Sequence, residues 1–80
     1  MPHFTYILEC SDKTLYVGYT KDIDRRLAEH NTSPKGARYT KARRPVRLVR
    51  VEKFRTLSKA LKRECEIKSW SRKKKLELIK

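Results

Sequence analysis

The sequence predicts an α+β fold, a small three-stranded antiparallel sheet flanked by helices in the order β-β-α-β-α-α. Three observations support this. Two strand-like segments joined by turn residues open the chain, a third follows Pro45, and the segments between and after them repeat their apolar residues with helical spacing. The 80 residues contain no linker or repeat, so residues 1–80 are expected to form a single domain.

The predicted strands are rich in β-branched and aromatic residues, and they comprise residues 4–10, 15–20 and 46–54. The alternation of the third strand slips between Leu48 and Val49, which predicts a bulge or burial on both faces. Gly18 lies inside the second strand, where glycine usually marks a bulge or the close approach of another group.

The loop between the first two strands decides which of their side chains share a face. A three-residue loop of residues 12–14, pairing Ser11 with Leu15, puts Tyr6 and Tyr16 on the same face. A two-residue loop would put these tyrosines on opposite faces. We expect the three-residue loop.

Three helices are predicted from helical periodicity and polar N-cap residues. Asp22 caps a first helix that runs to about Asn31. Thr56 or Ser58 caps a second helix that continues to about Trp70. The remaining segments are a basic loop over residues 35–44 and a short terminal helix over residues 71–80. The inward-facing side chains of the terminal helix are expected to be Leu76 and Ile79.

The charge of the chain predicts a polyanionic partner. Lys and Arg number 22 against 9 acidic residues, and the excess lies in residues 41–80, with 16 basic and 4 acidic side chains. Phosphate neutralisation is the main source of non-specific affinity for nucleic acid. Nucleic acid is therefore the expected partner, DNA in preference to RNA. A ribosome-associated protein, a membrane-surface binder and a solvated basic face are the alternatives.

The cellular location expected from the sequence is the cytoplasm. No apolar run approaches the roughly 20 residues that cross a bilayer, and the first four residues do not resemble a signal peptide. Cys10 and Cys65 have no neighbours at zinc-ligand spacing, so both are expected to be reduced and buried. No membrane partner is expected.

Two predicted helices carry charged residues on the faces that should pack on the sheet. Arg26 and His30 fall in one stripe with Ile23 and Leu27. Glu64 shares a face of the second helix with a further set: Leu57, Ala60, Leu61, Cys65 and Lys68. Structural explanations remain open: an ion pair of Glu64 with Lys68, an extended Arg26 at the edge of the stripe, and a hydrogen-bonded core His30.

These residues resemble the signature of the GIY-YIG nuclease family. The resemblance covers nearly the whole chain and rests on these elements: Thr5-Tyr6-Ile7, Tyr16-Val17-Gly18, Arg26 followed by His30-Asn31, and Glu64. It is closest to very short bacterial stand-alone members with a Gly-Ala-x-Tyr-Thr sequence, here residues 36–40. The chain departs from the family in having Thr5 in place of a glycine and no asparagine after Glu64.

The resemblance implies catalytic roles for five side chains. Glu64 would hold one Mg²⁺ or Mn²⁺ ion, and Arg26 would stabilise developing negative charge. Tyr16 would act as general base on water with help from His30, and Tyr6 would hydrogen-bond within the same network.

Basic side chains outside this set are expected to track the phosphate backbone. They are Lys35, Arg38, Lys41, Arg43, Arg44, Arg72, Lys73, Lys74 and Lys75. The expected protein is thus a metal-dependent nuclease, as a monomer or a weak homodimer. The alternative function is a basic nucleic-acid-binding module with weak or no catalysis.

Overall fold

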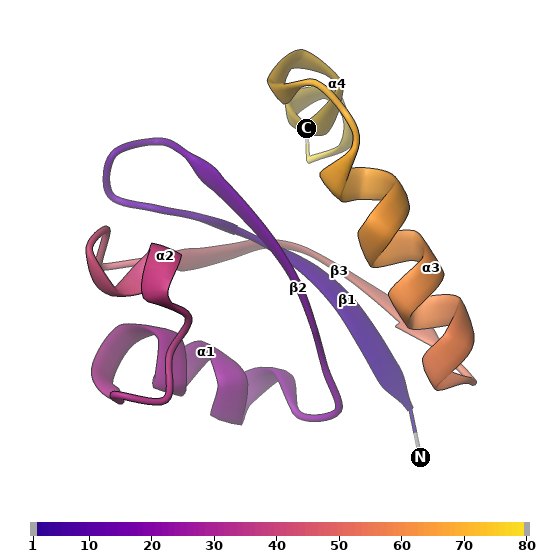
Figure 1. Ribbon diagram of the computed structural model, residues 1–80, viewed down its shortest axis with the longest axis horizontal. Coiled ribbons are helices and arrows are strands. Elements are labelled where there is room, and N and C mark those ends of the chain that lie inside the picture. Colours follow the sequence, from indigo (N-terminus) through magenta and orange to yellow (C-terminus); the bar gives the residue numbers. More distant parts are fainter. Residues whose placement is uncertain (1, 80) are drawn as a thin grey trace.

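The computed structural model describes residues 2–79 and has the predicted α+β architecture (Figure 1). The elements in chain order are β1 (His3–Glu9), β2 (Leu15–Thr20), α1 (Ile23–Thr32), α2 (Arg38–Lys41), β3 (Arg47–Phe54), α3 (Leu57–Lys68) and α4 (Arg72–Leu78). The short helix α2 lies in the segment that the sequence predicted to be a loop. Lys80, the predicted end of the last helix, lies outside the described residues.

The three strands form one antiparallel sheet in the order β2-β1-β3. Helices α1 and α2 lie on one side of the sheet, and α3 and α4 lie on the other (Figure 1). Alternate residues of β1 therefore enter two different apolar clusters. Tyr6 and Leu8 pack with Ile23 and Leu27 of α1, whereas Ile7 packs in the cluster that contains residues of α3 and α4.

The predicted loop of three residues is present, but it is formed by residues 11–13 and not by residues 12–14. The backbone of Cys10 pairs with that of Thr14, with a Cys10 N to Thr14 O distance of 2.9 Å. Lys13 closes the loop with φ of 70°, a left-handed conformation that no glycine or asparagine marked in the sequence. Asp12 stabilises the turn by accepting the backbone N–H of Thr14 at 3.1 Å.

The new loop position shifts the pairing by two residues, so it preserves the predicted faces. Leu8 pairs with Tyr16 and Tyr6 with Gly18. Tyr6, Tyr16 and Gly18 therefore lie on the face covered by α1.

The predicted bulge in the third strand is confirmed. Ile7 of β1 lies opposite Arg50, but the next residue, Leu8, lies opposite Leu48. Val49 is the extra residue, and it packs in the cluster on the α3 side. The slip in the apolar alternation was thus a correct signal.

Side chains near the end of α1 bind the segment that precedes β3. The Asn31 amide accepts the Val46 N–H at 2.7 Å and donates to the Val46 carbonyl at 3.0 Å. Arg44 donates to three carbonyls at the end of α1, those of Glu29 (3.2 Å), His30 (2.6 Å) and Ser33 (2.6 Å). Of these, the His30 carbonyl would otherwise lack a backbone partner, whereas the Glu29 and Ser33 carbonyls also accept the Ser33 and Gly36 N–H groups. The contacts hold residues 37–46 against α1.

The predicted inner face of the second long helix was partly wrong. Ala60 and Ile67 are the buried residues of α3, while Leu57 and Leu61 are 42% and 41% exposed. The buried Thr5 hydroxyl donates to the Ala60 carbonyl at 2.7 Å. This bond holds the face of α3 that contains Ala60 against the sheet. The predicted burial of both cysteines is likewise corrected, because Cys65 is exposed.

The other end of the chain follows the prediction more closely. Of the two candidate caps, Thr56 is the N-cap of α3, and its side chain accepts the Lys59 N–H. Ile79 packs against the core as expected, but Leu78 joins it there in place of Leu76. No helix in residues 2–79 has the length and apolar character that a membrane span requires.

Candidate active site

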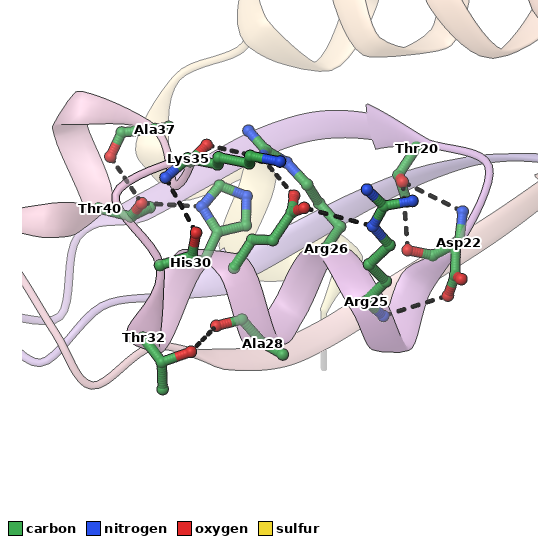
Figure 2. A network of polar contacts seen from close by, with 12 residues as sticks. Thr20, Asp22, Arg25, Arg26, Ala28, His30, Thr32, Lys35, Ala37 and Thr40 are labelled. Carbon is green, nitrogen blue, oxygen red and sulfur yellow. Dashed lines mark hydrogen bonds and ion pairs between the residues drawn. The ribbon is translucent and has the colours of Figure 1, made fainter.

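Tyr6 and His30 form a buried polar contact between β1 and α1. Tyr6 Oη lies 2.8 Å from His30 Nε2, and the two residues are 3% and 0% exposed. The other ring nitrogen, His30 Nδ1, lies 2.8 Å from Thr40 Oγ1 in α2. Thr40 in turn donates to the Ala37 carbonyl at 2.9 Å, as Figure 2 shows.

This chain of contacts fixes the direction of each hydrogen bond. Thr40 has one hydroxyl hydrogen, which goes to Ala37, so Thr40 accepts from His30 Nδ1–H. A neutral imidazole protonated at Nδ1 accepts at Nε2, so the Tyr6 hydroxyl donates to His30. Both nitrogens of His30 are therefore occupied.

Burial keeps both groups neutral at physiological pH. It lowers the pKa of His30 from 6.5 to about 4, and the positive charge of Arg26 adds to this effect. Burial also raises the pKa of Tyr6 to about 12, while Arg26 opposes the rise. The negative charge of Glu64 acts on the pKa of Tyr6 in the same direction as burial. Tyr6 is thus a proton donor and cannot serve as a base near pH 7.

The ring of Tyr16 lies among three other rings. Its centroid is 5.2 Å from that of His30, edge to face, and 6.5 Å from that of Tyr6. Tyr39 of α2 stacks on it with centroids 6.0 Å apart, and the Arg43 guanidinium lies 3.9 Å from the Tyr39 centroid. The Tyr16 hydroxyl has no hydrogen-bond partner among residues 2–79. Since no buried side-chain oxygen there lacks a partner, this hydroxyl is open to solvent.

Arg26 reaches the cluster from the middle of α1 (Figure 2). Its Nη1 donates to Glu29 Oε1 at 2.9 Å and to the Lys35 carbonyl at 3.0 Å. Burial alone would lower the pKa of Arg26, but the hydrogen bond from its guanidinium to Glu29 and its interaction with the nearby Tyr6 raise that pKa above its ordinary value. Arg26 therefore keeps a fixed positive charge beside the Tyr6 hydroxyl.

Glu64 approaches from α3, on the other side of the sheet. Its side chain is 18% exposed and pairs with Lys68, Oε2 to Nζ 3.4 Å. Its charge contributes to the pKa of Tyr6, so the carboxylate lies within electrostatic range of the cluster. The ion pair with Lys68, which was the structural explanation for Glu64, is present, and the carboxylate is partly buried.

A divalent ion at this cluster would depend on one carboxylate. Among residues 2–79, no group of three or more His, Cys, Asp or Glu side chains could hold a metal ion. Mg²⁺ commonly binds through one or two carboxylates, with waters and substrate phosphates completing its shell. The half-buried Glu64 fits that mode.

Gly18 makes the close packing of the two strand tyrosines possible. A Cβ at Gly18 would lie 2.5 Å from Tyr6 Oη and 2.6 Å from Tyr6 Cζ. It would also lie 3.1 Å from Tyr16 Cε2. The Tyr6 ring therefore covers the glycine of the neighbouring strand, which is the close approach that a glycine within a strand predicts.

The predicted phosphate-binding residues fall into two groups. Three bind polar groups: Arg43 pairs with Asp12 at 3.0 Å, Arg44 binds the end of α1, and Arg72 donates to the Lys13 carbonyl at 2.7 Å. A fourth, Lys74, lies over the Trp70 ring, with Nζ 4.3 Å from the ring centroid. The others are Lys35, Arg38, Lys41, Lys73 and Lys75, all exposed except the half-buried Lys75. The second group offers the freer cations to a phosphate backbone.

Two residues of the cluster, Tyr39 and Thr40, were given no role from the sequence alone. Both belong to the Gly-Ala-Arg-Tyr-Thr sequence at residues 36–40. Thr40 holds His30, and Tyr39 stacks on Tyr16. The sequence of residues 36–40 did not predict helix α2, and without that helix neither the contact of Thr40 with His30 nor that of Tyr39 with Tyr16 could be inferred.

The fold and this cluster define a small single-sheet domain of the GIY-YIG type, with two strand tyrosines beside an arginine and a histidine of the following helix. The family model described as the GIY-YIG catalytic domain matches residues 2–77, and the chain belongs to this family.

Its relatives are short proteins of similar length. The chain is 59% identical to a UPF0213 protein of Syntrophus aciditrophicus, over 98% of this chain and 90% of that protein. It is 58% identical to a UPF0213 protein of Staphylococcus aureus, over 98% and 94%. The solution NMR structure of a UPF0213 protein from Bacillus halodurans is similar with a TM-score of 0.64 and 48% identity, over 99% of this chain and 83% of that one. A solution NMR structure from E. faecalis has a TM-score of 0.67 and 43% identity, with the same coverage.

Proposed function

We propose that this protein is a metal-dependent nuclease that hydrolyses phosphodiester bonds of nucleic acid, DNA in preference to RNA. The observation that carries the proposal is the convergence of Tyr6, Tyr16, Arg26 and His30, with Glu64 within electrostatic range. The Arg26 cation, the Tyr16 phenol and the Glu64 carboxylate are groups that phosphodiester hydrolysis can use, and the contact between Tyr6 and His30 holds the tyrosine rings in place.

In this proposal Tyr16 is the general base. Its hydroxyl is open to solvent and has no hydrogen-bond partner among residues 2–79, so it can accept a proton from an attacking water. His30 cannot take that proton directly, because Tyr6 and Thr40 occupy both its nitrogens. In this proposal His30 helps Tyr16 indirectly, by positioning the rings of Tyr6 and Tyr16.

Arg26 is the proposed stabiliser of negative charge on the phosphoryl group. A planar guanidinium suits phosphate oxygens, and the partial burial of Arg26 strengthens its interaction with them. Its bonds to Glu29 and to the Lys35 carbonyl hold it in place before substrate binds.

Glu64 is the proposed ligand of one Mg²⁺ or Mn²⁺ ion. When bound, such an ion supplies Lewis-acid charge stabilisation and lowers the pKa of a coordinated water. Lys68 holds the carboxylate at 3.4 Å, so Glu64 is oriented without an ion. The proposed protein acts in the cytoplasm as a monomer or a weak homodimer, and sedimentation velocity tests its oligomeric state.

The test compares Glu64→Gln with Glu66→Gln, a matched change on the same helix at a 54% exposed side chain that pairs with Arg63. Labelled DNA and RNA are incubated with each protein over a Mg²⁺ and Mn²⁺ titration. We expect Glu64→Gln to lower the cleavage rate at least about 100-fold and Glu66→Gln to leave it nearly unchanged. Equal rates for the two variants would refute the assigned role of Glu64.

A further inference from the structure

A cluster of exposed cations surrounds Phe54 where β3 ends and α3 begins. We call it the β3–α3 patch, and its members are Lys53, Arg55, Lys59 and Lys62. Two surface hollows meet at Phe54. One, of about 430 Å³, is lined by Pro2, Lys53, Phe54 and Arg55. The other, of about 230 Å³, is lined by Phe54, Lys59, Lys62, Arg63 and Glu66.

The charges of the patch are not neutralised within the protein. None of its four members forms an ion pair with another residue in the range 2–79. The acidic residues nearby are already paired, because Glu52 binds Arg50 and Arg63, and Glu66 also binds Arg63. The patch therefore presents four uncompensated positive charges around one half-buried aromatic ring.

This arrangement is unfavourable for the free protein. Lys59 and Lys62 are three residues apart on α3 and so are neighbours on the helix surface, where like charges repel. Two other neighbouring positions on helices of this chain are paired with opposite charge, Arg25–Glu29 and Lys68–Glu64. A polyanion bound at the patch would relieve this repulsion.

The patch shares α3 with Glu64, but it is separate from the tyrosine cluster of the candidate active site and from the basic segments identified in the sequence. β3 and β2 are the opposite edges of the sheet, and β2 carries Tyr16 and Gly18. The patch also lies outside the basic loop 35–44 and the run 72–75. The active-site cluster therefore does not explain it.

We propose that the β3–α3 patch binds the phosphate backbone of nucleic acid at a second place, away from the bond to be cut. Lysine ammonium groups act as point charges for phosphate, and an aromatic ring among them suits a polynucleotide. The identity of the partner rests on the proposed function. The longest extent of the molecule is 30 Å, so one strand of about nine nucleotides could reach both places.

The test uses two charge-matched double variants. Lys59→Gln with Lys62→Gln removes half of the patch, and Lys13→Gln with Lys21→Gln removes two exposed lysines at the two ends of β2. Binding of a labelled 20-base-pair DNA is measured by fluorescence anisotropy in EDTA, over a range of salt concentrations. Thermal melts by circular dichroism verify that both variants fold.

We expect the patch variant to reduce the slope of log affinity against log salt by about 1.8, the value for two lost phosphate contacts. The β2 variant should reduce it clearly less. Lys53→Gln with Arg55→Gln provides a second, independent measurement of the patch and should behave like the first patch variant. If neither patch variant changes the slope more than the β2 variant does, the proposal is overturned.

The outcome is independent of the nuclease proposal, because no cleavage occurs in EDTA. Patch-dependent binding by a protein that never cuts would remove the nuclease proposal and leave the patch in place. Cleavage by the wild-type protein together with equal slopes for all variants would overturn the patch proposal and leave the nuclease proposal in place.

Discussion

Two tyrosine-to-phenylalanine substitutions separate the structural tyrosine of the cluster from the proposed catalytic one. Tyr6→Phe removes the donor to His30 Nε2, which is fully buried and is left without a partner. Tyr16→Phe removes a hydroxyl that has no partner among residues 2–79. Both changes keep the ring, so packing is nearly constant between them.

The magnitude follows from the hydrogen bond. Leaving a buried acceptor unsatisfied costs about 1–3 kcal/mol in the free energy of unfolding. The chain has 80 residues, so its unfolding entropy is about 0.17 kcal/mol/K and each kcal/mol lowers the Tm by about 6 °C. Tyr6→Phe should therefore lower the Tm by about 6–18 °C. Tyr16→Phe should change it by less than about 3 °C, the effect of an ordinary surface substitution.

The assay is a thermal melt of both variants at pH 7, combined with cleavage of labelled DNA in Mg²⁺ below the lower Tm. We expect Tyr16→Phe to be as stable as the wild-type protein and inactive. Tyr6→Phe should be less stable but keep part of its activity. Equal Tm values for the two variants would refute the hydrogen-bond assignment, and a fully active Tyr16→Phe would refute its role as the base.

Three further predictions concern packing, pH and the end of α1. Gly18→Ala places a methyl group 2.5 Å from Tyr6 Oη, so it should destabilise the protein by about 1–3 kcal/mol in urea denaturation; an unchanged midpoint would contradict the packing described. The pKa of His30 is lowered to about 4 in the folded protein, so as the pH falls His30 is protonated in the unfolded chain before it is protonated in the folded one. Stability should therefore fall, by at most about 3 kcal/mol, as the pH drops from about 6.5 to about 4, and an NMR titration that protonated the His30 ring at pH 6 would disprove this. Arg44→Ala removes two bonds to carbonyls of α1 and one to the carbonyl of its C-cap Ser33, so it should lower the free energy of unfolding by about 2–3 kcal/mol without changing the salt dependence of DNA binding. A changed salt slope with normal stability would show that Arg44 binds phosphate instead.

Local patterns in the sequence were sufficient to predict much of the fold. The slip at Leu48 and Val49 located the bulge, and Asp22 located the start of α1, where its side chain accepts the Arg25 N–H. These features depend on neighbours within a few residues, so a single sequence contains their cause.

Features that depend on contacts between distant segments were not predictable in the same way. The exposure of Leu61 follows from the rotation of α3, which the bond between Thr5 and the Ala60 carbonyl fixes across 55 residues. Arg44 was assigned to nucleic acid because its charge is visible in the sequence, whereas its carbonyl partners are not. Propensity and charge patterns contain no information about such partners.

The candidate site was predictable in its membership more than in its roles. The inward faces of the helices pointed to Arg26, His30 and Glu64, and the parity of the hairpin pointed to the two tyrosines. The direction of the hydrogen bond from Tyr6 to His30 could be assigned only from the position of Thr40 in the structure. That direction is the basis for proposing that His30 helps Tyr16 as a positioning residue.

The most direct measurement is a time course of labelled DNA with purified wild-type protein, in Mg²⁺ and in EDTA. The central claim is that a phenol, a guanidinium and a carboxylate from separate segments act on one phosphodiester. We expect strand cleavage that requires the divalent ion and increases with protein concentration. DNA and RNA substrates that remain intact in Mg²⁺ and in Mn²⁺, with folded protein at saturating concentration, would contradict it.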